Sequence, residues 1–153
     1  MNTQTIVKAP NAIDVLIAHH RKINMLFTDY FELGESDGRL KEKFVQFLCR
    51  DLLKYMNIKE QFFHPAIVGD IKRGQDWVDE ANIAHVGFKE LIAKLQNMNS
   101  DHELYDAMVE VLFERFEVYV DEIETCIFPL LERSKVDLDE LGESLRQGAE
   151  KVG

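Results

Sequence analysis

Apolar residues recur along most of the chain at the 3.6-residue spacing of an amphipathic helix, and no segment alternates as a half-buried strand does. The pattern predicts four long helices. Asn11 caps the first, which ends near residue 32, and the others cover residues 39–63, 75–96 and about 101–133. With short links between them, these helices predict an all-α, up-down-up-down four-helix bundle. The expected inward positions are Ile13, Leu16, Ile17, His20, Ile23, Met25 and Phe27, then Phe44, Phe47, Leu48, Leu52, Tyr55, Lys59 and Phe62, then Val78, Ala81, His85, Phe88, Ile92 and Leu95, and finally Met108, Val111, Leu112, Phe116, Tyr119 and Ile123.

The helix boundaries follow from capping and helix-breaking residues. Pro65 should stop the second helix, because proline lacks an N–H and disfavours helix in the residue before it. Ser100 with Glu103 reads as a capping box for the fourth helix. Asp137 with Glu140 reads as another, which starts a short C-terminal fifth helix against one side of the bundle. We expect residues 1–10 to form a flexible N-terminal arm and residues 11–153 to form a single domain.

One helical hairpin occurs twice in the chain. Tyr55 and Pro65 are separated by nine residues, and the same spacing returns 64 residues later in Tyr119 and Pro129. Glu60 matches Glu124 at the same offset. A helix with one inward histidine precedes each copy, His20 in the first half and His85 in the second. The two halves therefore carry the same kinds of residue at matched depth.

Composition and charge narrow the class of partner. The 153 residues carry a formal net charge of −10, which disfavours nucleic acid and anionic membranes as partners. No apolar run approaches a membrane span, and no signal-peptide core follows Met1, so we expect a cytoplasmic protein. Cys49 and Cys126 are expected to be small buried apolar residues. The sequence has no nucleophile elbow, no phosphate loop and no inward acid–base pair of carboxylates, so we do not expect an enzyme.

The matched residues predict a polar layer inside the bundle. Tyr55 and Lys59 are four residues apart and share a face of the second helix, as Tyr119 and Ile123 do on the fourth. Bundle cores often hold metals between facing helices through inward histidines and carboxylates.

These residues resemble the bacterial hemerythrin-like proteins of the HHE cation-binding family over nearly the whole chain. The resemblance is carried by residues 11–23, Phe63-His-Pro-Ala, Val78-Asp-Glu-Ala with His85, Glu103-Leu-Tyr-Asp-Ala, Phe128-Pro and residues 134–142. It implies a four-helix bundle around a non-haem diiron site. The family's ligands are one His each from the first and third helices, His-x-x-x-Glu from the second, and His-x-x-x-Glu or Asp from the fourth. Oxygen-carrying members bind O2 reversibly at the iron pair.

Carried over by position, the resemblance retains His20 and His85 but changes the other ligand positions. Tyr55 and Tyr119 stand where the family has histidines. Lys59 and Ile123 stand where it has carboxylates, and a protonated lysine cannot bridge two metals.

Three interpretations of this layer remain open. In the first, the chain is a binding or sensing protein whose diiron site is lost or remodelled, with Lys59 replacing a metal charge or reaching past the layer to water. In the second, it binds iron through His20, His85, Tyr55 and Tyr119 and handles O2, peroxide or NO, with Glu60 or Glu122 contributing only if its helix is rotated. In the third, His20 and His85 hold haem or a small ligand. The cofactor is thus undetermined, with iron a candidate and a usual diiron pair disfavoured. The partner is O2 or a small ligand, a second copy in a homodimer, or another protein.

Overall fold

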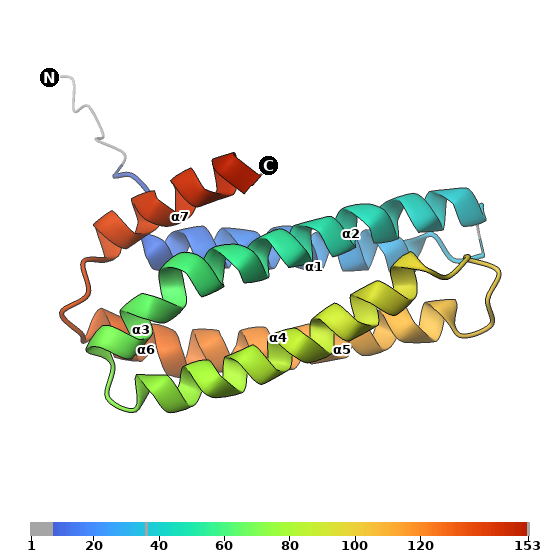
Figure 1. Ribbon diagram of the computed structural model, residues 1–153. Coiled ribbons are helices and arrows are strands. Elements are labelled where there is room, and N and C mark those ends of the chain that lie inside the picture. The colour runs from blue at the N-terminus through green and yellow to red at the C-terminus, as the bar shows by residue number, and fades with distance from the viewer. Residues whose placement is uncertain (1–7, 36, 153) are drawn as a thin grey trace, which may run out of the picture.

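A computed structural model describes residues 8–35 and 37–152, which form only helices and connecting loops (Figure 1). The elements are α1 (Ala12–Glu32), α2 (Gly38–Ile58), the π-helix η1 (Lys59–Phe63), α3 (His64–Asp70), α4 (Gly74–Gln96), α5 (Tyr105–Glu122), the π-helix η2 (Ile123–Ile127), α6 (Phe128–Glu132) and α7 (Leu138–Val152). Figure 1 shows α1, α2, α4 and α5 running alongside one another, with α7 lying outside them over α1 and α2. The structure confirms the predicted four-helix bundle with a short C-terminal helix.

The expectation that Pro65 stops the second helix is wrong. The chain continues through the π-helix η1 into α3, and Pro65 lies in the first turn of α3, where a backbone N–H is not needed. The His64 N–H donates to the Lys59 carbonyl, an i→i−5 bond that adds one residue to the turn. The second half repeats this arrangement, with Pro129 in the first turn of α6 and the Phe128 N–H donating to the Ile123 carbonyl.

Two of the three predicted caps are present. The Asn11 side chain accepts from the Asp14 N–H while Asp14 accepts from the Asn11 N–H, which completes a capping box. The Asp137 side chain accepts from the Glu140 N–H at the start of α7. Ser100 does not cap the fourth helix, because its N–H donates to Glu42 and α5 begins later, at Tyr105.

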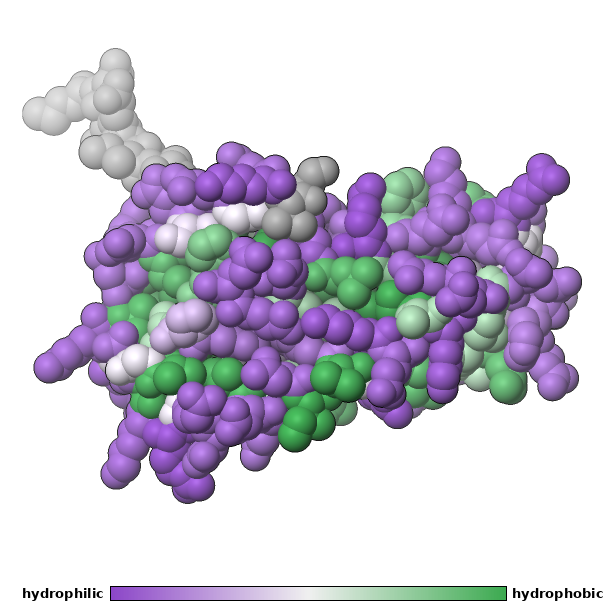
Figure 2. All heavy atoms as spheres, in the orientation of Figure 1, coloured by the Kyte–Doolittle hydropathy of each residue, from purple (hydrophilic) through white to green (hydrophobic). Residues whose placement is uncertain are grey.

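The core follows the predicted stripes with a few exceptions. Met25, Phe47 and Val111 are exposed, and Val109 takes the inward place that was expected of Val111. Cys49 is buried as expected, but Cys126 is exposed on η2. In Figure 2, polar residues cover most of the visible face and hydrophobic residues lie in stripes between them, as expected when each helix buries one face.

Residues 8–10 lie outside any helix and are exposed, and the rest of the arm, residues 1–7, lies outside the described residues. Among the helices described, none is long and apolar enough to cross a membrane.

Helix α7 packs on the bundle through glycine at one of its closest contacts. A Cβ added at Gly142 would lie 2.6 Å from the carbonyl carbon of Asn11 and 2.8 Å from the backbone nitrogen of Ala12. Backbone atoms cannot move aside as a flexible side chain can. Gly142 therefore allows the close approach of α7 to the start of α1.

We expect Gly142→Ala to lower the free energy of unfolding by about 1–3 kcal/mol, because the added methyl group overpacks a backbone contact. Urea denaturation followed by circular dichroism measures the change.

Gly69→Ala is the matched control. Gly69 is also helical, in α3, but a Cβ there meets nothing within 4 Å. Alanine is preferred over glycine in a helix by about 1 kcal/mol, so this variant should be as stable as the parent or more stable. Equal losses from both substitutions would show that α7 does not depend on this contact.

Candidate functional site

Four aromatic side chains from four helices meet in one buried layer. His20 lies on α1, Tyr55 on α2, His85 on α4 and Tyr119 on α5, and none is more than 8% exposed. The His20 Nε2 forms a hydrogen bond with the Tyr55 hydroxyl. The His85 Nε2 lies 2.9 Å from the Tyr119 hydroxyl. The structure thus brings together the residues that the repeat matches, and each tyrosine pairs with one histidine.

Lys59 lies in the middle of this layer and does not reach water. Its side chain is 0% exposed, and its Nζ donates a hydrogen bond to the Tyr119 hydroxyl. The Nζ also lies 4.2 Å from the centre of the Tyr119 ring, 5.0 Å from that of Tyr55, 5.8 Å from that of Trp77 and 5.9 Å from that of Phe63. Lys59 therefore occupies an aromatic box.

A chain of hydrogen bonds leads from Lys59 to the surface through the second half of the repeat. The Lys59 Nζ donates to Tyr119, whose hydroxyl can donate to the His85 Nε2, because the His85 Nδ1 lies 2.7 Å from the Glu60 Oε1 and carries the ring proton toward that carboxylate. Glu60 is partly exposed and also accepts from Lys89 at 3.3 Å. Each polar atom on this path therefore has a partner.

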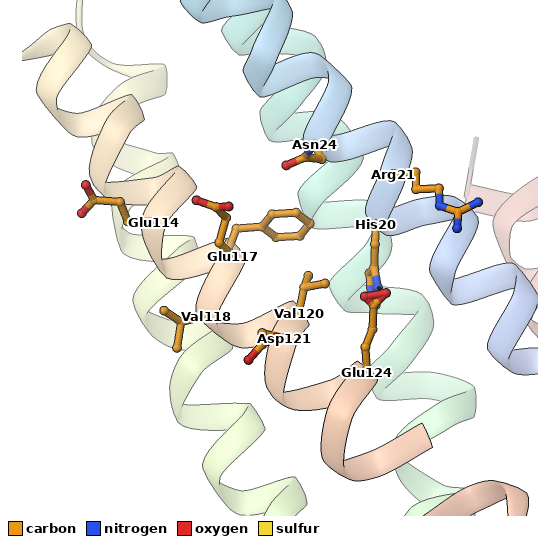
Figure 3. Close-up of a pocket in the computed structure, with 10 residues that line it drawn as sticks. His20, Arg21, Asn24, Glu114, Glu117, Val118, Val120, Asp121 and Glu124 are labelled. Atoms are coloured by element: carbon orange, nitrogen blue, oxygen red, sulfur yellow. Dashed lines mark ion pairs between the residues drawn. The ribbon is translucent and has the colours of Figure 1, made fainter. Parts of the chain in front are cut away.

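The first half of the repeat has a gap where the second half has a hydrogen bond. The Glu124 Oε1 lies 3.7 Å from the His20 Nδ1, too far for a hydrogen bond. The Nδ1 is buried and has no hydrogen-bond partner among the described residues. Figure 3 shows the two side chains facing each other, His20 from α1 and Glu124 from η2.

The two π-helices explain the arrangement of the residues below the layer. The wider turn of η1, closed by the bond from the His64 N–H to the Lys59 carbonyl, turns His64 inward, where it stacks on His85 with ring centres 5.4 Å apart. Phe128 follows η2 in the same way and stacks on His20 at 6.2 Å.

His64 is therefore a residue of the site that the α-helical spacing missed. Its side chain is buried, and its Nε2 has no hydrogen-bond partner among the described residues. The match of His64 with Phe128, at the same offset as the tyrosines and prolines, was the signal in the sequence that could have identified it.

Burial determines the protonation state of the layer. It lowers the pKa of Lys59 well below the ordinary value and raises the pKa values of Tyr55 and Tyr119. Burial, with a smaller contribution from Lys59, lowers the pKa of His20 to about 3 and that of His85 to about 4. Burial therefore favours the uncharged forms of the amine, the phenols and the imidazoles.

The glutamates that flank the layer lie on the outer side of the histidine rings. Burial acts to raise the pKa of Glu60, but the hydrogen bond from His85 and the charge of Lys89 lower it overall. Glu60 meets the Nδ1 of His85, and Glu124 faces the Nδ1 of His20, whereas the Nε2 atoms point into the layer. Glu122 is exposed and lies at a groove between α4 and α5, so η2 turns Glu124 rather than Glu122 toward a histidine.

The diiron centre that the resemblance implies does not fit these residues. Each Nε2 is hydrogen-bonded to a phenol, and the carboxylate positions hold the Lys59 amine and the buried alkyl chain of Ile123. Glu60 and Glu124 are on the far side of the rings and cannot share a metal ion with Nε2. The layer holds no carboxylate that could bridge two metal ions.

Comparison with known proteins places the chain in a family. The family model described as hemerythrin HHE cation binding domain matches residues 11–146. The search of curated proteins gives no match. A crystal structure of a hemerythrin HHE cation binding domain-containing protein from Mycobacterium kansasii superimposes with a TM-score of 0.79 at 20% identity, over 94% of this chain and 88% of that one. That likeness shows the shared fold, and the match to the family model over most of the chain shows that this protein belongs to the hemerythrin HHE cation-binding family.

Proposed function

We propose that this chain is a hemerythrin-like binding or sensing protein, not an enzyme, in which a metal-free polar network replaces the usual diiron site. The observation that carries the proposal is the position of Lys59, whose Nζ is fully buried and hydrogen-bonded to Tyr119 among four aromatic rings. An amine in this place provides a donor where the family would have a metal ion. The amine donates to Tyr119, and burial favours its uncharged form.

The neighbouring substitutions support the same reading. Tyr55 and Tyr119 are each hydrogen-bonded through their hydroxyl to the Nε2 of one imidazole, which occupies a nitrogen that would otherwise bind metal. Ile123 fills its position with a buried apolar side chain. A buried polar network with satisfied members stabilises one arrangement of the core, while removal of one member leaves unpaired groups. In this proposal the network, instead of a metal centre, fixes the arrangement of the four helices around the layer.

A second candidate function is iron binding through His20, His85, Tyr55 and Tyr119, with chemistry on O2, peroxide or NO. Its support is that the two Nε2 atoms and two hydroxyls lie in one layer. Iron(III) would have to drive off both phenolic protons and displace the Lys59 Nζ from Tyr119. Iron-loaded, oxidised protein would then show a tyrosinate-to-iron charge-transfer band in the visible, and a colourless protein would count against this candidate.

Iron content tests the proposed function. We expect protein produced with added iron to hold far less than two irons per chain, because the layer offers no bridging carboxylate. Elemental analysis of the purified protein measures it, and two irons per chain would contradict the proposal.

The combined substitutions Tyr55→His, Lys59→Glu, Tyr119→His and Ile123→Glu should restore binding of two irons per chain, since they return the family's ligand types to the layer. The matched control carries the same changes but keeps Lys59, and it should bind less iron because it lacks one bridging carboxylate. Circular dichroism establishes that both variants are folded. A folded quadruple variant without iron would show that the ligand positions are assigned wrongly.

Replacing Lys59 should change how stability depends on pH. The folded-state pKa of Lys59 is depressed, so between that value and the ordinary pKa of 10.5 the unfolded chain binds one more proton. The free energy of unfolding should therefore rise with pH, by up to about 1.4 kcal/mol per pH unit. Lys59→Met should be more stable at pH 7 and should lose this slope, as measured by urea denaturation between about pH 7 and pH 9.

Lys94→Met is the control, because Lys94 is exposed on α4 and makes none of these contacts. It should keep the slope of the parent protein. Parallel curves for the parent and Lys59→Met would mean that Lys59 is charged in the folded state.

A further inference from the structure

A groove of about 770 Å³ between α1 and α5 lies outside the aromatic layer (Figure 3). We call it the acidic groove. It is defined by His20 of α1 and by four carboxylates, Glu114, Glu117 and Asp121 of α5 and Glu124 of η2. Arg21 also lies at the groove, and Figure 3 shows its side chain extending away from α5. The groove thus concentrates negative charge at one place on a protein whose net charge is already −10.

The carboxylates form a line rather than a cluster. They are three, four and three residues apart, so they follow one side of the helix over about 15 Å. No group of three or more His, Cys, Asp or Glu side chains among the described residues converges closely enough to hold a metal ion. An extended ligand with several positive charges matches this spacing better than a single metal ion does.

A second, independent feature marks one end of the line. The His20 side chain is 4% exposed, and its Nδ1 has no hydrogen-bond partner although it lies 3.7 Å from the Glu124 Oε1 at the groove. On the other side of the pseudo-symmetric layer the corresponding atoms, His85 Nδ1 and Glu60 Oε1, are in direct contact at 2.7 Å. An ammonium group that enters beside this pair can bridge it, with one N–H donated to the Glu124 carboxylate and another to the His20 Nδ1.

The walls of the groove suit a ligand with alkyl segments between its charges. Val118 and Val120 line it along with Phe116. The methylene groups of such a ligand can pack on these side chains, while its ammonium groups pair with the line of carboxylates. A strongly hydrated metal ion gains nothing from such walls.

We propose that the acidic groove binds a linear polyamine, with one terminal ammonium group bridging Glu124 and His20 and the others along Asp121 and Glu117. The ammonium donates to the Nδ1, so the ring proton of His20 lies on Nε2 and is directed to Tyr55. Binding thereby fixes the tautomer of a residue in the aromatic layer. This inference goes beyond the proposed function and does not depend on it.

Titration of the full-length protein with spermine tests the inference. Isothermal calorimetry at about 0.15 M ionic strength should show one saturable site per chain, because screening at that salt suppresses diffuse counterion binding. Glu117→Gln, Asp121→Asn and Glu124→Gln together should raise the dissociation constant at least tenfold, on the order of 1.4 kcal/mol.

A second triple variant with the same change in charge is the control. Glu80→Gln, Glu90→Gln and Asp101→Asn are exposed positions away from the groove, and they should change the dissociation constant by less than twofold. Nitrogen NMR of the histidine side chains gives a readout at the site itself. Spermine should move the Nδ1 resonance of His20 to that of an unprotonated, hydrogen-bonded nitrogen.

Three results would overturn the proposal. Equal weakening by the two triple variants would mean that spermine responds only to net charge. Displacement of spermine by magnesium at equal concentrations of positive charge would mean that the groove is a general cation site. An unchanged His20 nitrogen spectrum at saturating spermine would place the ligand elsewhere.

Discussion

The structure depends on the burial of one amine, that of Lys59, among aromatic rings in the middle of the bundle. A charged ammonium group is very costly in such a place, and burial lowers the pKa of Lys59 so that the neutral form is favoured. The tyrosines are held as phenols and the histidines as neutral imidazoles for the same reason. The layer is thus a set of groups whose uncharged forms are favoured by burial and which are hydrogen-bonded to one another, except at the outer nitrogen of His20. That chemistry is unlike a metal centre, where anionic ligands offset the charge of the ions.

The duplicated hairpin gives the layer its near-symmetry, and the π-helices shape its lower side. Each π-helix adds one residue just before a proline, which turns His64 and Phe128 onto the rings of His85 and His20. The symmetry fails at the outer nitrogens, where Glu60 is bonded to His85 and Glu124 stands off from His20. The proposed metal-free network rests on the hydrogen bonds at the centre of the layer. The proposed polyamine site rests on the gap between Glu124 and His20 at its edge.

Much of this could be predicted from the sequence. Apolar spacing locates the helices, and matched offsets single out His20, Tyr55, His85 and Tyr119. The errors near the layer have one physical origin, the assumption of an unbroken α-helical period. A π-turn shifts the register by one residue, and no propensity of Lys59 to Phe63 signals it, so α-helical spacing predicts a stop at Pro65 and does not place His64 at the layer. The inward turn of Glu124 instead of Glu122 has the same cause in η2. Short-range capping rules also failed at Ser100, whose N–H is taken by Glu42 from another helix.

The protonation state of Lys59 in the folded protein tests the central claim most directly. Carbon-13 labelling of the lysine ε-carbons allows each lysine to be followed by NMR as a function of pH, with Lys59 assigned by its absence in Lys59→Met. The account predicts that the Lys59 resonance is that of a neutral amine at pH 7 and stays so on raising the pH, while the exposed lysines titrate at their ordinary values. A Lys59 resonance that is charged at pH 7 and titrates together with the exposed lysines would contradict it.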